Sequence, residues 1–205
     1  MKMNSELGPP RVNTLVQTLG LWLLAVSGWK AKTNLDIDLL PKKFVAILAP
    51  HTSNWDFMFI VGILFALGLR FTWFGKEEIF RWPLGTIFRR MGGIPIQRGT
   101  SQNMVQQTTA MIRSREQVII GIAPEGTRST AKYWKSGFYH IARKTDIPIV
   151  LAYLDYSRRV GGLAQIVWTT DDINEDMKVI RDHYTSNGYI AKNPEHVGEI
   201  ALKPQ

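Results

Sequence analysis

Residues 44–56 read FVAILAPHTSNWD, an apolar run that stops at Pro50 and passes directly into polar residues. A short apolar run that ends at a proline is typical of a buried strand, and the Thr-Ser-Asn that follows favours the start of a helix. Residues 57–69 continue this helix with 13 mostly apolar positions. That is too short to span a membrane, so we expect a buried helix.

Strands and helices continue to alternate along the rest of the chain. Further strands are predicted at residues 71–74, 93–96, 117–123, 147–154 and 163–169, and further helices at residues 77–91, 101–115, 136–145 and 172–185. This alternation indicates a single α/β domain, which we assign to residues 44–205, with a central mostly parallel or mixed sheet flanked by helices. Ligands of such domains bind beyond the carboxyl ends of the strands.

The chain upstream of this domain contains an uncharged segment, residues 12–29, whose strongly apolar part is residues 19–26. With Trp22 and Trp29 and basic residues on both sides, it is typical of a helix that lies in a membrane interface. A core helix packed on the domain is the alternative. We expect residues 1–43 to form a membrane-associating helix and linker, in a monotopic or peripheral protein at the cytoplasmic face of the inner (plasma) membrane.

Composition narrows the possible ligands. The 25 Lys and Arg against 17 Asp and Glu give a net charge of +8, which attracts nucleic acid, anionic lipid or phosphorylated small molecules. No nucleic-acid-binding motif is present, so lipid and phosphate are favoured over a nucleic-acid partner. The absence of cysteine excludes disulfides, thiolate metal sites and a cysteinyl acyl-enzyme. No histidine pair at metal spacing and no nucleotide-binding loop is found, so we expect neither a metal nor a nucleotide cofactor.

His51 and Asp56 form the first candidate site. Five helical steps turn about 500°, so the two side chains meet only if His51 precedes the helix and the chain bends between them. A carboxylate there would fix the imidazole tautomer and stabilise the imidazolium that forms when His51 accepts a proton. The alternative is structural, because Ser53 and Asp56 also fit a capping box at the start of the helix.

The second candidate site is Glu125-Gly-Thr-Arg128, which follows the strand at 117–123. Gly126 permits a tight turn, Thr127 can close it through its hydroxyl, and Arg128 suits a phosphate. An ordinary turn with a surface Arg–Glu pair is the alternative. Lys76 and Arg98 each follow a short strand and are further candidates for holding a phosphate.

Taken in order, these blocks resemble the glycerolipid acyltransferase family that includes the 1-acylglycerol-3-phosphate acyltransferases. The resemblance runs from about residue 44 to residue 155, over His51-x4-Asp56, the stretch from Gly75-Lys76 through Pro83 to Arg98, Pro124-Glu-Gly-Thr-Arg-Ser129 and Ile147-Pro-Ile-Val150. It implies that His51 is the general base and that Asp56 orients it. It also implies that Arg98, Glu125 and Arg128 bind the glycerol phosphate of the acceptor, with Gly126 and Thr127 shaping the turn.

The implied reaction transfers a fatty acyl group from an acyl thioester, on coenzyme A or acyl carrier protein, to the free hydroxyl of a lysophospholipid in the membrane. No further cofactor is implied. The most direct acceptor is 1-acyl-sn-glycerol 3-phosphate, which would give phosphatidic acid. The sequence departs from the family pattern at Pro83-Leu-Gly85, Ala123 and Leu151. These departures leave the acceptor open, so acylation of another lyso-lipid, such as an aminolipid or one with a larger headgroup, is an alternative. A non-catalytic membrane-binding protein on the same scaffold is a second alternative, against which the presence of both His51 and Asp56 argues.

Overall fold

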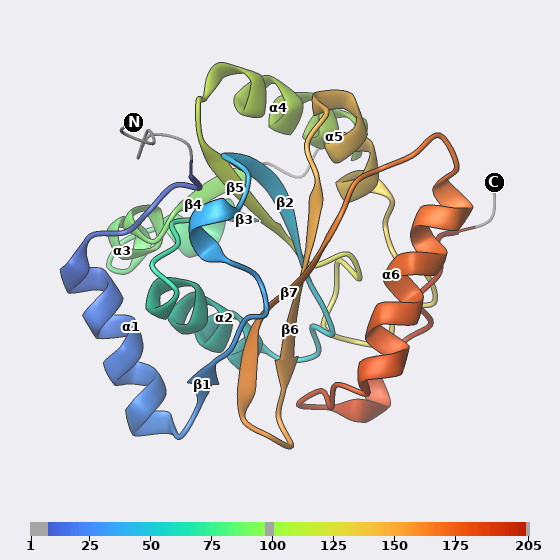
Figure 1. Cartoon of the computed structure of the whole chain (residues 1–205). Helices are drawn as coiled ribbons and strands as arrows, with labels where there is room; N and C mark the ends of the chain where they lie inside the picture. The colour runs from blue at the N-terminus through green and yellow to red at the C-terminus, as the bar shows by residue number, and fades with distance from the viewer. Residues whose placement is uncertain (1–7, 97–100, 204–205) are drawn as a thin grey trace, which may run out of the picture.

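A seven-stranded sheet organises the chain, and the computed structural model describes it over residues 8–96 and 101–203 (Figure 1). The strand order is β1-β7-β6-β2-β5-β3-β4. The strands are β1 (Lys30–Ala31), β2 (Lys43–Leu48), β3 (Thr72–Lys76), β4 (Gly93–Ile96), β5 (Val118–Ile122), β6 (Ile149–Asp155) and β7 (Val160–Val167).

Parallel pairing dominates this sheet. Strands β6, β2, β5, β3 and β4 all run in one direction, and only β7 pairs antiparallel, with β6. The expected α/β domain with a mostly parallel or mixed sheet is therefore confirmed. The two-residue strand β1, which pairs with β7, was not predicted, because two residues are too few to show a periodic pattern.

Helices cover both faces of the sheet (Figure 1). They are α1 (Thr14–Ser27), α2 (Asn54–Ala66), α3 (Gly85–Arg90), α4 (Ser101–Ser114), α5 (Gly137–Thr145) and α6 (Ile173–Asn187), with 3-10 turns η1 (Ile37–Leu39), η2 (Glu77–Phe80) and η3 (Pro194–His196). The helix expected at residues 77–91 is divided into η2 and α3, with the interruption near Pro83 as predicted.

The central strand β2 shows why the fold needs helices on both sides. Its alternate side chains enter different apolar clusters: Phe44 and Ala46 pack with α1 and α2, whereas Val45 and Ile47 pack with α4, α5 and α6. All four side chains are fully buried. A strand buried on both faces reads as a continuous apolar run, which is the pattern seen at residues 44–49.

Helix α2 is also buried on two sides, because it lies between the sheet and α1. The close approach of the two helices centres on Gly20 of α1. A Cβ atom at this position would lie 2.7 Å from the backbone nitrogen of Ala66 and 2.9 Å from Cβ of Phe65. The absence of a side chain at Gly20 thus allows α1 to cover the apolar outer side of α2.

The outer face of α1 is apolar as well. Gly20 and Leu24 are buried against the domain, but large apolar side chains on the same helix are exposed: Leu15, Leu19, Leu21, Trp22, Leu23 and Val26. Within the described residues, no helix combines the length and apolar character needed to cross a bilayer. Helix α1 therefore packs on the domain and also presents an apolar surface. Its association with a membrane stays a prediction. The domain boundary between residues 43 and 44 also stays a prediction.

Replacing Gly20 with leucine should force α1 away from α2. Overpacking of this kind costs about 1–3 kcal/mol of unfolding free energy, or a fall in Tm of roughly 2–12 °C for a chain of this size. Thr18→Leu, at an exposed position of the same helix, is the matched control and should change Tm by much less. Equal Tm values for the two variants would contradict the described α1–α2 contact.

Candidate active site

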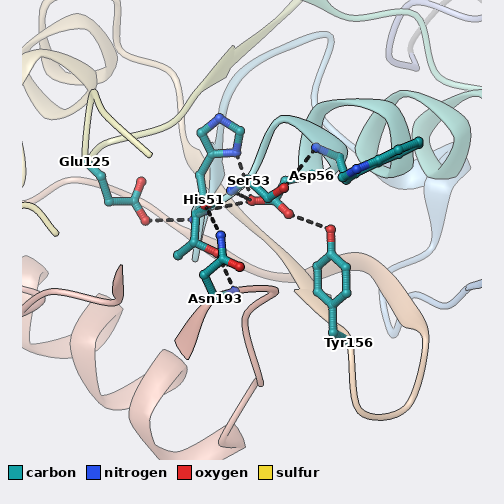
Figure 2. Close-up of polar contacts among 8 residues, drawn as sticks. His51, Ser53, Asp56, Glu125, Tyr156 and Asn193 are labelled. Carbon is teal, nitrogen blue, oxygen red and sulfur yellow. Dashed lines mark hydrogen bonds and ion pairs between the residues drawn. The ribbon is translucent and has the colours of Figure 1, made fainter. Parts of the chain in front are cut away.

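Three loops meet at the carboxyl edge of the sheet because their strands are neighbours. β2 lies between β6 and β5, and the three strands run parallel. His51 follows β2, Glu125 follows β5 and Tyr156 follows β6 directly. The sheet order therefore brings these residues, which are far apart in the sequence, around one point (Figure 2).

Asp56 is the centre of this arrangement. Its Oδ2 accepts hydrogen bonds from the backbone N–H groups of Thr52 and Ser53, each at 2.7 Å, and lies 3.3 Å from Nδ1 of His51. Ser53 is the N-cap of α2, and its side chain accepts a hydrogen bond from the backbone of Trp55. The sequence offers the capping box and the histidine–carboxylate pair as alternatives, and the structure contains both.

The environment of Asp56 keeps it ionised. Its side chain is almost fully buried, and burial alone would raise its pKa. The hydrogen bonds from His51, Tyr156 and Ser53 outweigh that effect and hold the pKa below its ordinary value. Because the carboxylate accepts a hydrogen bond from Nδ1 of His51, the tautomer with the proton on Nδ1 is favoured. Nε2 is then left as the basic nitrogen.

Two further residues support this pair and were not predicted. The hydroxyl of Tyr156 donates to Oδ1 of Asp56 at 2.6 Å, and the backbone and side chain of Asn193 bond to Thr52 at 3.1 and 2.8 Å (Figure 2). Tyr156 directly follows a strand. The rule that ligands bind beyond the carboxyl ends of strands, which points to His51 and Glu125, therefore also points to Tyr156. Asn193 lies in a segment without a periodic pattern, so the sequence holds no comparable signal for it.

Glu125 contacts the backbone of His51. Its Oε1 accepts a hydrogen bond from the backbone N–H of His51 at 3.1 Å, and its buried Oε2 has no hydrogen-bond partner among the described residues. Burial raises the pKa of Glu125 to about 7, although the bonds from its own backbone and from His51 act in the opposite direction. The carboxyl group therefore braces the His51 loop, in addition to any role with the acceptor.

The rest of the Glu125–Arg128 segment forms the expected tight turn. Gly126 adopts a φ of +65°, and a Cβ there would lie 2.7 Å from Cε of Lys135. The hydroxyl of Thr127 accepts a hydrogen bond from the backbone of Ser129 at 3.2 Å. Arg128 is exposed on this turn. The positive φ and the close approach of Lys135 explain the glycine at position 126, and the hydrogen bond to Ser129 explains the threonine at position 127.

Lys76 and Arg98 are the other candidate phosphate ligands. Lys76 is the last residue of β3 and is exposed. Arg98 lies outside the described residues, two positions after the end of β4. The structure therefore joins His51, Asp56 and Glu125 by direct contacts. It gives Lys76 and Arg128 positions on the same edge of the sheet without a contact to those three side chains.

An apolar cavity of about 120 Å³ opens beside His51 and Asp56. Its walls come from α2 and from the ends of β2, β3, β5 and β6, and they are formed mainly by Leu48, Phe57, Ile60, Trp73, Phe74 and Leu154. A hydrocarbon group placed in this cavity would be removed from water next to the imidazole. Across residues 8–96 and 101–203, no cluster of three or more His, Asp or Glu side chains is arranged to hold a metal ion.

Comparison with known proteins agrees with this architecture. The family model described as Acyltransferase matches residues 34–154. The 1-acyl-sn-glycerol-3-phosphate acyltransferases of Limnanthes alba and Limnanthes douglasii are each 26% identical over 179 residues, a match that covers 75% of this chain and 62% of theirs. The crystal structure of the 1-acyl-sn-glycerophosphate (LPA) acyltransferase PlsC from Thermotoga maritima is similar with a TM-score of 0.59. That match has 13% identity and covers 87% of this chain and 80% of that one, so it bears on the fold alone.

The raised pKa of Glu125 predicts a specific pH dependence of stability. The pKa of Glu125 is 4.5 at its ordinary value and about 7 in the folded protein. At a pH between these two values, Glu125 is protonated to a greater extent in the folded protein than in the unfolded chain. The contribution of Glu125 to stability therefore falls as pH rises through this window, by about 3 kcal/mol in total. Glu125→Gln lacks this titration. The difference in unfolding free energy, variant minus wild type, should rise by that amount between about pH 4.5 and about pH 8 in urea titrations. A constant difference across this range would contradict the prediction.

Proposed function

Because the chain belongs to the acyltransferase family, we propose that it transfers a fatty acyl group from an acyl thioester to the free hydroxyl of a lysophospholipid. The observation that carries this proposal is the His51–Asp56 pair at an apolar cavity, with Nε2 of His51 available for a substrate. The preferred acceptor is 1-acyl-sn-glycerol 3-phosphate and the product phosphatidic acid. The two Limnanthes relatives carry the corresponding name, but this chain spans only 62% of their length, so acceptor and donor are proposals here.

The geometry of the pair supports the following reaction. Nε2 of His51 accepts the proton of the acceptor hydroxyl, and the oxygen attacks the thioester carbonyl. The C–O bond of the new ester forms, the C–S bond breaks, and the proton on the imidazolium passes to the leaving thiolate. Asp56 stays ionised throughout and stabilises the imidazolium. No acyl-enzyme is required, and the thiol, from coenzyme A or acyl carrier protein, leaves as the second product.

The two substrates approach from chemically different sides. The apolar cavity between α2 and the strand ends suits the first part of an acyl chain, because it offers hydrocarbon side chains next to the base. Arg128 and Lys76 are exposed cations on the carboxyl edge, where they suit the phosphate of the acceptor. The fork of Arg128 can hold two phosphate oxygens, so it fixes orientation as well as charge.

The exposed face of α1 supports association with a membrane surface. Trp22 and Val26 are 59% and 70% exposed, and Trp55 and Met58 at the start of α2 are exposed as well. An apolar face on a helix of 14 residues suits a position in the interface plane rather than a span. The acceptor, itself an amphiphile, would reach the site from that surface. The cytoplasmic face of the inner membrane remains our expectation for the location.

His51→Ala should abolish acyl transfer and leave the fold intact. The variant removes the base, which contributes about 10²–10⁴-fold to the rate, whereas Asp56 keeps its bonds to Thr52, Ser53 and Tyr156. Transfer is measured with labelled thioester and lysophosphatidic acid, and Tm reports the fold. His140→Ala, at an exposed histidine of α5, is the control and should retain activity. Near-normal turnover of His51→Ala would exclude this mechanism.

Arg128→Ala should raise the KM for a phosphorylated acceptor by about 10- to 100-fold, the usual value of hydrogen bonds to a charged group, with little change in kcat. Lys132→Ala, which removes another exposed cation of the same loop, is the control. Kinetics are compared across lysophosphatidic acid, lyso-lipids with larger headgroups, aminolipids and monoacylglycerol. An equal effect of Arg128→Ala on the phosphate-free acceptor would exclude a role in binding phosphate, and no thioester consumption with any acceptor would favour the non-catalytic alternative.

Trp22→Ser combined with Val26→Ser should weaken binding to phosphatidylcholine vesicles by at least about 10-fold, since each buried large apolar side chain contributes about 1.5–3 kcal/mol. Co-sedimentation measures the partition coefficient. Thr18→Ser, on the same helix, is the control and should bind like the wild type. Unchanged binding of the double variant would show that the outer face of α1 does not contact the lipid.

A further inference from the structure

We propose that the protein has a second ligand site, a groove that binds the phosphate headgroup of an anionic membrane phospholipid. This site, called here the aromatic groove, has a volume of about 550 Å³ and is lined by Trp29, Trp55, Phe59, Tyr156, Arg159 and Lys192. It is separate from the apolar cavity beside His51, and the two share none of their lining residues. The lipid surface in this proposal rests on the proposed function, in which α1 meets the membrane.

The walls of the aromatic groove are formed by rings that pack on one another. Trp29 stacks on Phe59 with ring centroids 4.2 Å apart, and it meets the edge of Tyr156 at 4.8 Å. Trp55 lies against Phe59 at 6.4 Å and is 61% exposed at the rim. Because these contacts hold the rings in position, the groove exists before a ligand arrives. A ligand with an apolar part next to a polar group matches such walls.

The charge of the groove selects an anion. Arg159 and Lys192 are both exposed, and neither forms an ion pair with a carboxylate of residues 8–96 or 101–203. Nζ of Lys192 lies 5.6 Å from the ring centre of Tyr156, so this cation is held at the wall. A guanidinium and an ammonium that line one groove, with no acidic residue among its lining residues, suit a phosphate group.

The position of the groove indicates that this phosphate belongs to a lipid. Ser27, the last residue of α1, lines the groove directly after the exposed Val26, and Trp55 belongs both to the groove and to the exposed apolar residues of α2. The groove thus lies where exposed apolar side chains of α1 and α2 meet the two cations Arg159 and Lys192. On a membrane, this boundary corresponds to the level of the headgroups, where basic residues attract anionic lipids.

The groove also contacts the residues that support the His51–Asp56 pair. Tyr156 is a wall of the groove, and its hydroxyl donates to Asp56 at 2.6 Å. Lys192 directly precedes Asn193, which holds the backbone of Thr52. A headgroup bound between the two cations would restrain both connections, so Tyr156 acts as a positioning residue. Anionic lipid should therefore raise turnover even when the substrates are short-chain and soluble.

The first experiment measures binding. The wild type, Arg159→Gln/Lys192→Gln and the control Lys144→Gln/Lys178→Gln are co-sedimented with phosphatidylcholine vesicles that contain or lack phosphatidylglycerol. Both double variants lose two positive charges, but the control residues lie on α5 and α6. The groove variant should lose affinity for the anionic vesicles by about 30-fold, at roughly fivefold per basic residue, and the control by less than about twofold. Binding to neutral vesicles should be unchanged in both.

Equal losses in the two double variants would overturn the proposal, because they would show that only total charge matters. Release of the wild type from anionic but not neutral vesicles by free coenzyme A would also overturn it, since the groove would then hold the phosphates of the donor. This experiment needs no enzymatic turnover, so a failure of the proposed acyl transfer would be seen separately, and Tm values identify a variant that has not folded.

The second experiment tests the connection to the site. Tyr156→Phe keeps the ring in the groove wall and removes the hydroxyl that reaches Asp56. This variant should bind anionic vesicles like the wild type but should lose the increase in kcat that these vesicles produce with short-chain soluble substrates. An increase equal to that of the wild type would overturn the positioning role of Tyr156.

Discussion

The site depends on one buried carboxylate that has two functions. Asp56 caps α2 through the backbone of Thr52 and Ser53, and the same oxygen atom faces Nδ1 of His51. The start of the helix and the orientation of the His51 imidazole therefore depend on the same carboxylate. The chain can form this arrangement because His51 precedes the helix and Ser53 has the extended backbone of an N-cap, which turns the imidazole back toward the first helical turn.

Residues from distant parts of the sequence hold His51 and Asp56 in place. Glu125 holds the backbone of His51 from one neighbouring strand, and Tyr156 holds Asp56 from the other. Asn193 reaches the same loop from the C-terminal region. Each contact involves a polar group that is at least partly buried, where an unsatisfied donor or acceptor is costly. The result is an imidazole whose position is set by contacts from several parts of the chain.

Much of this arrangement could be predicted, and the reasons lie in local patterns. The strands β2, β4 and β5 are apolar runs next to proline or glycine, and their parallel order follows from the alternation with helices, so the meeting of His51 and Glu125 at one edge was foreseeable. The same rule places Tyr156 at this edge, but no local pattern shows that its hydroxyl binds Asp56. The sequence also left the role of α1 open, because the buried Gly20 and the exposed Trp22 lie only two positions apart.

If the proposed reaction holds, the packing of α1 at Gly20 has a consequence for the choice of acceptor. The close contact packs α1 directly on α2, and α2 carries Asp56 in its first turn. Where α1 rests on a bilayer, the height of the imidazole above the hydrocarbon is then set by the protein rather than by a flexible tether. A hydroxyl group that lies too deep, or too far out on a long headgroup, would miss the nitrogen. Such an enzyme would select an acceptor by the depth of its hydroxyl group in the bilayer as well as by its chemical structure.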